Sequence, residues 1–152
     1  MISHMPRRPL FYLGADHAGF ALKEALKPLL QRYGVEIEDL SPTFMPKDDY
    51  PLIGGTVARH VVNNDQTQGI LVCGSGIGIA IAANRVRGVR AAVVHDADDA
   101  IRARSEDHAN ILVLGGRVLS AKKLPAILEA WLKTKPSKAT RHVRRAFELD
   151  LL

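Results

Sequence analysis

The sequence predicts an α/β fold in which a parallel sheet is covered by helices on both faces. Along the 152 residues, five short apolar runs alternate with longer segments in which apolar residues recur at helical spacing. Short buried strands separated by crossover helices are typical of parallel sheets. Because such crossovers are right-handed, the expected architecture is a three-layer, doubly wound, Rossmann-like sandwich with a five-stranded sheet.

The predicted strands are brief and mostly apolar. The first reads LFYLG and the third GILVC, both typical of strands buried on two faces. The second, VEIED, alternates apolar and acidic residues and is therefore expected near an edge of the sheet. The predicted strands cover residues 10–14, 35–39, 69–73, 90–94 and 111–114.

The segments between these strands have the spacing of helices, with two prolines that constrain them. Pro28 should bend the first helix unless its missing N–H faces solvent. Pro125 must lie in the first turn of its helix or bend it. Residues 41–51 contain three prolines and predict a loop. The predicted helices lie around residues 22–30 and over 51–64, 77–86, 97–106 and 124–132.

Length and composition predict a single domain at 10–152 preceded by a tail at 1–9. No apolar run approaches the ~20 residues that span a membrane, and the N-terminal stretch lacks the apolar core of a signal peptide. One cysteine excludes a disulfide within the chain. The simplest expectation is a cytoplasmic protein with no membrane partner.

The C-terminal segment 137–152 has no place in the sandwich. One face is basic and the other apolar, so we expect a helix that packs on a partner subunit. Residues 133–145 hold six basic residues and no acidic one, within a net charge of +5. This basic stretch fits a solvated tail or a phosphate-bearing ligand. Nucleic acid is not expected, because aromatic residues are few and no binding motif is present.

Polar groups should gather at one edge of the sheet. In an open parallel sheet, ligands bind beyond the carboxyl ends of the strands. That edge is predicted to hold Asp16 and His17 after the first strand, residues 73–78 after the third, His95 and Asp96 after the fourth, and Gly116 and Arg117 after the fifth.

The stretch CGSGIG at this edge joins a strand to a helix. Glycines let the backbone approach a ligand closely, and a helix N-terminus attracts negative charge. The stretch lacks the Lys-Ser/Thr pair of a P-loop and the spacing of G-x-G-x-x-G, so a nucleotide site is disfavoured. Cys73 stands where a helix N-terminus favours a thiolate, although tight packing without chemistry also explains a buried cysteine and glycines.

Five stretches of the sequence together resemble one enzyme family. They are GADHAGFALKEAL, DDYP, GILVCGSGIGIAIAANRVRGVRAA, NILVLGGRV and RHVRR. In these stretches the chain, from residue 10 to about 149, is similar to the ribose-5-phosphate isomerase B family, which includes allose- and galactose-6-phosphate isomerases. The resemblance implies reversible aldose–ketose isomerisation of a phosphorylated sugar through a cis-enediolate. It also implies a homodimer or tetramer with active sites between subunits, and no metal or organic cofactor.

The first substrate implied is ribose 5-phosphate, converted to ribulose 5-phosphate. A tetrose or hexose phosphate stays open as an alternative, as does a non-catalytic protein that binds sugar phosphates. By the resemblance, Cys73 is the base that moves a proton between C1 and C2, and Ser75 contacts the sugar oxygens. The backbone of Gly74, Gly76 and Gly78 would steady the enediolate.

The resemblance assigns further residues to the two ends of the substrate. Asp16, as a catalytic group, and His17 would meet the sugar ring and the phosphate end. Some of the phosphate-binding arginines, which are named below, would come from the neighbouring subunit. The other implied pocket and phosphate-binding residues are Tyr50, Asn84, Arg117, Arg141 and Arg145.

One stretch departs from the family pattern. Residues 105–110 read SEDHAN where the family has a pattern like HNDAN, so Glu106 replaces the histidine associated with ring opening and Asp107 the asparagine. Glu106 could open the ring, or His108 could do so after a loop shift. A third hypothesis is a four-carbon substrate that has no ring to open. The alternative without function is a helix end that has drifted, with His108 on the surface.

Overall fold

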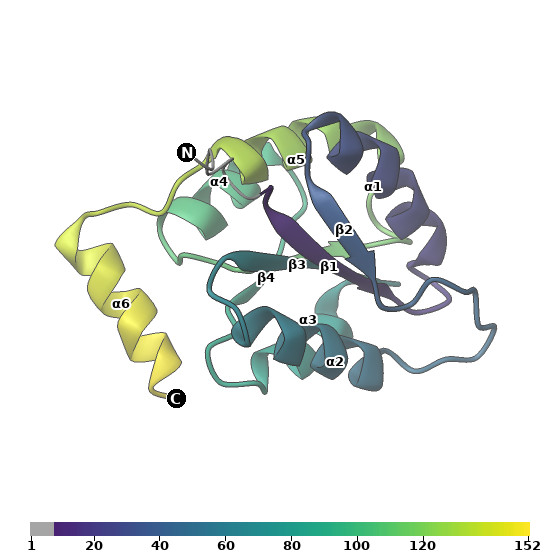
Figure 1. The fold of residues 1–152 in the computed structure, drawn as a ribbon, viewed down its shortest axis with the longest axis horizontal. Helices are drawn as coiled ribbons and strands as arrows, with labels where there is room; N and C mark the ends of the chain where they lie inside the picture. The colour runs from purple at the N-terminus through teal and green to yellow at the C-terminus, as the bar shows by residue number, and fades with distance from the viewer. Residues whose placement is uncertain (1–7) are drawn as a thin grey trace, which may run out of the picture.

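The computed structural model describes residues 8–152 and confirms the doubly wound α/β sandwich (Figure 1). Five strands pair in parallel in the order β2-β1-β3-β5-β4. The edge position predicted for the second strand is confirmed. The strands are β1 (Leu10–Ala15), β2 (Glu36–Asp39), β3 (Thr67–Cys73), β4 (Ala91–Val93) and β5 (Ile111–Gly115).

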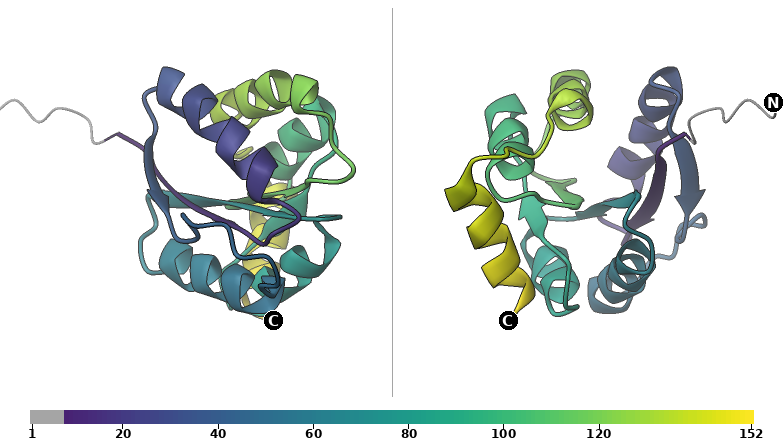
Figure 2. Two further views of the ribbon diagram at one scale, coloured as in Figure 1. Left: turned by 90° about the vertical axis from the view of Figure 1, so that its right-hand side faces the viewer. Right: turned by 60° about the vertical axis from the view of Figure 1, so that its left-hand side comes forward.

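Helices cover both faces of the sheet, as Figure 2 shows. One face carries α1 (Phe20–Arg32), α4 (Ala97–Ser105) and α5 (Leu124–Lys133), which follows a short 3₁₀ turn at Ala121–Lys123. The other face carries α2 (Tyr50–Val62) and α3 (Ile77–Asn84). For the strands and for helices α1 to α5, each observed end lies within two residues of the predicted end.

Each face has its own core. Against α1, α4 and α5 the core is rich in leucine and includes Phe11 and Trp131, both fully buried. The indole N–H of Trp131 donates to Gln68 Oε1 at 2.7 Å. Against α2 and α3 the core is built from smaller valine, isoleucine and alanine side chains. This smaller core lets α2 and α3 lie close to the sheet and to each other.

The two prolines behave as the helix geometry requires. Pro28 is exposed within α1, so its missing N–H faces solvent and the helix runs on to Arg32. Pro125 lies in the first turn of α5, where no N–H partner is needed.

The last helix, α6 (Thr140–Asp150), stands apart from the sandwich at the end of an extended connector, residues 134–139 (Figure 1). The connector is fastened where Ser137 N donates to Ser105 O at 2.9 Å. The far end of α6 is fastened by the ion pair between Arg90 and Asp150. Large apolar side chains on α6 and after it stay exposed, with Phe147 at 62% and Leu152 at 93%. An exposed apolar face of this kind fits the predicted contact with a partner subunit, which stays a prediction.

Within residues 8–152, every helix falls short of the length and apolar character that crossing a bilayer requires. The predicted tail at 1–9 lies outside the described residues except for Arg8 and Pro9, which are exposed.

Candidate active site

The carboxyl ends of β1, β3 and β5 lie side by side at one edge of the sheet. At this edge the chain leaves neighbouring strands toward opposite faces. After β1 it enters α1 on one face, and after the adjacent β3 it enters α3 on the other. Backbone hydrogen bonds join these ends: Asp16 N donates to Val72 O at 3.3 Å, and Gly116 N to Cys73 O at 2.7 Å. Such a switch in chain direction opens a crevice for ligands. The gathering predicted for Asp16, residues 73–78 and Arg117 is therefore what the fold produces.

Cys73 is the last residue of β3, and its side chain is 4% exposed. Gly76 N donates to Cys73 Sγ at 3.2 Å. The turn between them needs glycine, because Gly76 has φ +81° and a Cβ there would lie 3.2 Å from the backbone of Leu114. The Cys73 sulfur therefore lies at the N-terminus of α3, within hydrogen-bond reach of a backbone N–H.

Ser75 and Gly78 shape the entrance to α3. The exposed Ser75 accepts a hydrogen bond from Ile77 N at its Oγ, at 3.2 Å. The ring of Tyr50, from the start of α2, lies directly on Gly78, where an added Cβ would come within 2.6 Å of Tyr50 Cζ. Glycine at 78 therefore makes room for Tyr50 beside the turn, and α2 and α3 contribute to the same site.

Asp16 and His17 follow β1 in different environments. Asp16 is 5% exposed, and its Oδ1 accepts hydrogen bonds from Ala18 N and Gly19 N, both at 3.0 Å. It thus stabilises the turn that leads into α1. Both bonds use Oδ1, so Oδ2 is not committed to this turn. The half-exposed His17 extends from the same turn toward the loop that precedes α2.

Asp48 holds His17 in place. Asp48 Oδ1 accepts a hydrogen bond from His17 N at 2.7 Å and lies 3.2 Å from His17 Nδ1. A carboxylate against one ring nitrogen fixes the orientation of an imidazole and leaves Nε2 for a ligand. The sequence reasoning did not single out Asp48 as a site residue, although the DDYP stretch begins with it.

Arg117 brings a positive charge to this edge of the sheet. Arg117 N donates to Gly74 O at 2.9 Å, and a Cβ on Gly74 would touch Arg117 Nη1 at 3.4 Å. The guanidinium group therefore lies beside the glycine turn. Within the described part of the chain, no carboxylate pairs with it. A planar guanidinium beside a helix N-terminus suits a phosphate group.

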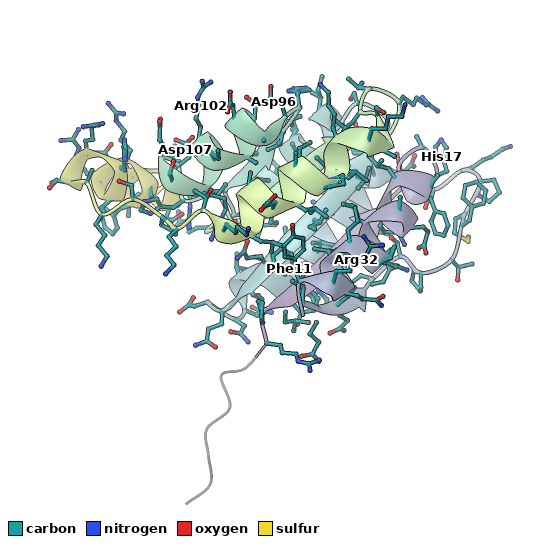
Figure 3. All side chains as sticks on the ribbon, turned by 90° about the horizontal axis from the view of Figure 1, so that it is seen from above. Phe11, His17, Arg32, Asp96, Arg102 and Asp107 are labelled. Atoms are coloured by element: carbon teal, nitrogen blue, oxygen red, sulfur yellow. The ribbon has the colours of Figure 1, made fainter. Side chains whose placement is uncertain are left out.

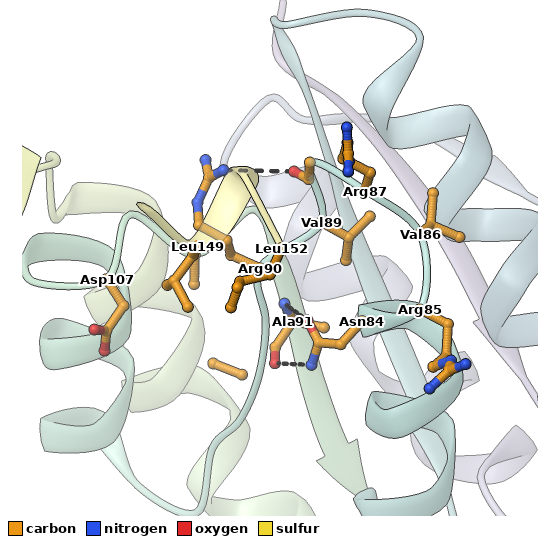
Figure 4. Close-up of a pocket in the computed structure, with 13 residues that line it drawn as sticks. Asn84, Arg85, Val86, Arg87, Val89, Arg90, Ala91, Asp107, Leu149 and Leu152 are labelled. Carbon is orange, nitrogen blue, oxygen red and sulfur yellow. Dashed lines mark hydrogen bonds between the residues drawn. The ribbon is translucent and has the colours of Figure 1, made fainter. Parts of the chain in front are cut away.

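Asn84 lies elsewhere. Its side chain donates to Ala91 O at 2.9 Å and accepts from Ala91 N at 2.8 Å, so it joins the end of α3 to the start of β4. It lines a cavity of about 730 Å³ at the amino edge of the sheet, together with Asp107 and Leu149 (Figure 4). Within one chain, Asn84 has a structural contact at the edge opposite to Cys73.

Glu106 and His108 also lie at the amino edge, because α4 starts beyond the carboxyl end of β4 and runs back along the sheet. Figure 3 shows His17 and Asp107 at opposite ends of the molecule. Glu106 is exposed at the end of α4. The structure therefore does not bring the 106–108 stretch to Cys73 of the same chain.

Hydrogen bonds hold His108 in place after the end of α4. It is half-buried, and its backbone adopts a left-handed conformation with φ +51°. Its Nε2 lies 3.0 Å from Ser137 O, and its carbonyl accepts a hydrogen bond from Arg90 Nε at 3.0 Å. A loop shift that frees the ring would break the contact with the connector to α6.

Arg141 and Arg145 are exposed on α6, away from the glycine turn. If they act at Cys73, a second copy of the chain must bring them there. Among residues 8–152, no group of three His, Cys, Asp or Glu side chains is arranged to hold a metal ion.

The comparisons with known proteins agree with this fold. A family model described as ribose/galactose isomerase matches residues 11–149. Ribose-5-P isomerase B of Listeria innocua is 40% identical over 79% of this chain and 81% of its own length. D-erythrulose-4-phosphate isomerase of Pectobacterium atrosepticum is 38% identical over 79% of this chain and 80% of its own length.

A solved structure agrees as well. Ribose-5-phosphate isomerase B of Mycoplasma genitalium with bound ribulose 5-phosphate superposes with a TM-score of 0.87 at 35% identity, covering 93% of this chain and 94% of that one. The family match spans the sandwich, the glycine turn and most of α6. The chain therefore belongs to the ribose/galactose isomerase family.

Proposed function

We propose that this protein isomerises a phosphorylated sugar between its aldose and ketose forms, with Cys73 as the base and ribose 5-phosphate as the substrate. The observation that carries the proposal is the Cys73 sulfur, buried at the start of α3 and hydrogen-bonded by Gly76 N. The relative from Listeria innocua is named a ribose-5-P isomerase, and the structure from Mycoplasma genitalium holds ribulose 5-phosphate.

The reaction needs a base beside the sugar and donors for a developing oxyanion. The Cys73 thiolate takes the proton from C2 of the open-chain aldose, and the electron pair of that C–H bond forms the C1–C2 double bond of the enediolate. Negative charge develops on O1, where backbone N–H groups at the start of α3 stabilise it. The hydroxyl proton of O2 passes to O1, Cys73 returns the first proton to C1, and O2 becomes the carbonyl oxygen. The product is the ketose, and the Cys73 thiolate is regenerated.

The phosphate end of the substrate would lie against basic side chains. His17, oriented by Asp48, and Arg117 belong to the same chain as Cys73. We propose that Arg141 and Arg145 come from the α6 helix of a second copy in a homodimer, together with the 106–108 stretch. Exposed Phe147 and Leu152 support that contact, because exposed apolar patches mark protein–protein interaction sites.

Mixed dimers test the shared site. Cys73→Ala should inactivate the chain, and so should Arg141→Ala with Arg145→Ala, but the two variants should complement each other. With random pairing, about half of the dimers are mixed and each mixed dimer keeps one intact site, so about one quarter of wild-type activity should return. The measurement is ribose 5-phosphate turnover after the variants are unfolded and refolded together.

Wild-type protein taken through the same refolding sets the full scale, and each variant refolded alone sets the background. Mixed samples that contain heterodimers yet stay at background activity would show that Cys73 and the two arginines of one active site come from the same chain. The proposal of a site shared between subunits would then be wrong.

A second candidate substrate is a four-carbon sugar phosphate. Glu106 stands in place of the family's ring-opening histidine, and His108 is held by Ser137 O. A tetrose or tetrulose 4-phosphate cannot close the usual furanose ring, because its terminal oxygen carries the phosphate. Such a substrate needs no ring opening, and the relative from Pectobacterium atrosepticum is named for one.

Glu106→Gln separates the two candidates. If ribose 5-phosphate is the substrate and Glu106 opens its ring, the variant should lose about 100-fold in kcat on ribose 5-phosphate. Turnover of D-erythrulose 4-phosphate, which has no ring to open, should stay within about twofold. Both are measured by NMR of the product and of solvent deuterium at C1 and C2. Wild-type protein that turns over D-erythrulose 4-phosphate and leaves ribose 5-phosphate unchanged would make the second candidate the correct one.

A further inference from the structure

Lys23 carries a fully buried ammonium group next to the candidate site. It lies on α1, and its side chain is 0% exposed. Its Nζ donates to Asp39 Oδ2 at 2.5 Å, to Ser41 O at 2.8 Å and to Glu24 Oε1 at 2.9 Å. An ammonium group has three donors, and a buried charge is tolerated only when it is paired and hydrogen-bonded. All three donors of Lys23 are therefore used.

Lys27, which is partly exposed to solvent, shares two of these acceptors with Lys23. Its Nζ lies 2.5 Å from Asp39 Oδ2 and 2.8 Å from Glu24 Oε1, and its side chain is 25% exposed. Burial would raise the pKa of Asp39, but the hydrogen bonds from Lys23, Lys27 and Ser41 outweigh burial and hold that pKa below its ordinary value. Lys23 differs from Lys27 in donating a hydrogen bond to the Ser41 carbonyl and in lying over the ring of Phe20.

Ser41 connects this cluster to the active site. Its N–H donates to Asp39 Oδ1 at 3.0 Å, and its Oγ accepts from Ala15 N at 2.8 Å. Ala15 immediately precedes Asp16 at the end of β1. The Lys23 ammonium thus holds the point where the chain leaves β2 and turns toward the candidate site.

The loop that starts at Ser41 ends on site residues. Asp48 binds His17, and Tyr50 covers Gly78 at the start of α3. Halfway along the loop, the Phe44 ring meets the Phe20 ring edge-on with centroids 5.6 Å apart. The Lys23 ammonium lies 4.5 Å from the centroid of that same Phe20 ring. Lys23 therefore contacts Ser41 at the start of the loop and Phe20, on which the middle of the loop packs through Phe44. The end of the same loop orients His17.

We propose that Lys23 is a positioning residue: through Ser41 and Phe20 it fixes the 41–49 loop so that Asp48 orients His17 and Tyr50 covers the glycine turn. This inference rests on the proposed function, because it concerns the same substrate site. Lys23 does not touch the substrate. Its loss releases the start of the loop, and the phosphate end of the sugar is then bound less tightly while the base, Cys73, stays where it is.

Lys23→Met tests the inference, with Lys27→Met as its matched control. Both variants remove one ammonium from the Asp39 and Glu24 carboxylates, but only Lys23→Met removes the donor to Ser41 O. We expect KM for ribose 5-phosphate to rise about tenfold in Lys23→Met with kcat within about threefold, because binding is weakened and chemistry is not. Lys27→Met should leave both constants within about twofold.

The ring signals of His17 give a second measurement, made by nitrogen NMR without substrate. In Lys23→Met they should move toward the positions seen in Asp48→Asn, and in Lys27→Met they should stay at the wild-type positions. Unchanged His17 signals and an unchanged KM in folded Lys23→Met, whatever its melting temperature, would overturn the inference and leave Lys23 with a stabilising role only.

Lys23→Arg keeps the test decisive if Lys23→Met does not fold. The guanidinium group preserves the charge opposite Asp39 but cannot fit its planar fork to the same three acceptors. The same displacement of His17 signals is expected, and wild-type signals with wild-type KM would again overturn the inference. Wild-type protein without isomerase activity would instead overturn the proposed function, since the His17 signals need no turnover.

Discussion

Replacing Cys73 by alanine should lower kcat for sugar-phosphate isomerisation by about 10²–10⁴-fold, the range that a positioned acid–base group contributes. The variant lacks the sulfur that accepts a hydrogen bond from Gly76 N, so no base is left there to take the proton from C2. The measurement is NMR of product formation in deuterated water, which also records the exchange of the C2 proton. Exchange should fall together with turnover, since both need the same proton transfer.

Binding of the sugar phosphate separates loss of the base from loss of the site. Calorimetric titration with ribose 5-phosphate should give a Kd for Cys73→Ala within about threefold of wild type, because the alanine removes no contact to phosphate. A variant that binds substrate and still exchanges the C2 proton at the wild-type rate would assign the base to another group at this edge, with Asp16 as a candidate.

Replacing Gly19 by alanine should destabilise the protein by about 3 kcal/mol, at the upper end of what overpacking costs. A Cβ on Gly19 would lie 2.3 Å from Val72 O and 2.4 Å from Val72 C. These are backbone atoms of β3, so no side-chain rotation can relieve the overlap. The start of α1 must move away from the end of β3, and the turn that holds Cys73 moves with it. The melting temperature should fall by about 10 °C.

Gly55→Ala is the matched control, since Gly55 is also buried but has a different neighbour. A Cβ there would approach Arg59 Nη1 at 3.2 Å, which is the mobile end of a long side chain. Alanine is preferred over glycine inside a helix, so this change should be neutral or stabilise by up to about 1 kcal/mol. Equal melting temperatures for the two variants would show that the close approach of Gly19 to β3 does not constrain the fold.

The sheet and the site edge were predictable because their signals are local. Apolar periodicity identifies strands and helices, and the rule for parallel sheets places Asp16, Cys73 and Arg117 at one edge without any knowledge of long-range contacts. The same rule says nothing of residues at helix ends that return to the amino edge. Only the family resemblance grouped Glu106 and His108 with Cys73, and within one chain α4 carries them to the opposite end.

No local sequence pattern identified residues whose role depends on partners far away in the sequence. Lys23 follows Leu22 on the buried side of α1, where a lysine is ordinarily unexpected. Its partners Asp39 and Ser41 come from the end of β2, and no spacing rule connects them to α1. Asn84 is the converse case: its place in a recognisable stretch suggested a substrate contact, whereas its amide group is occupied by the backbone of Ala91.

The anchors of the 41–49 loop divide it into parts that differ in how freely they can change. Ser41 and Asp48 are half-buried and bonded to the body of the protein, whereas residues 42–47 between them are exposed. Exposed segments between fixed points tolerate substitution and insertion. Apart from Phe44, whose ring packs on Phe20, residues 42–47 are therefore where new substrate ranges could be evolved, in nature or in a library, while the catalytic edge and the fold stay as they are.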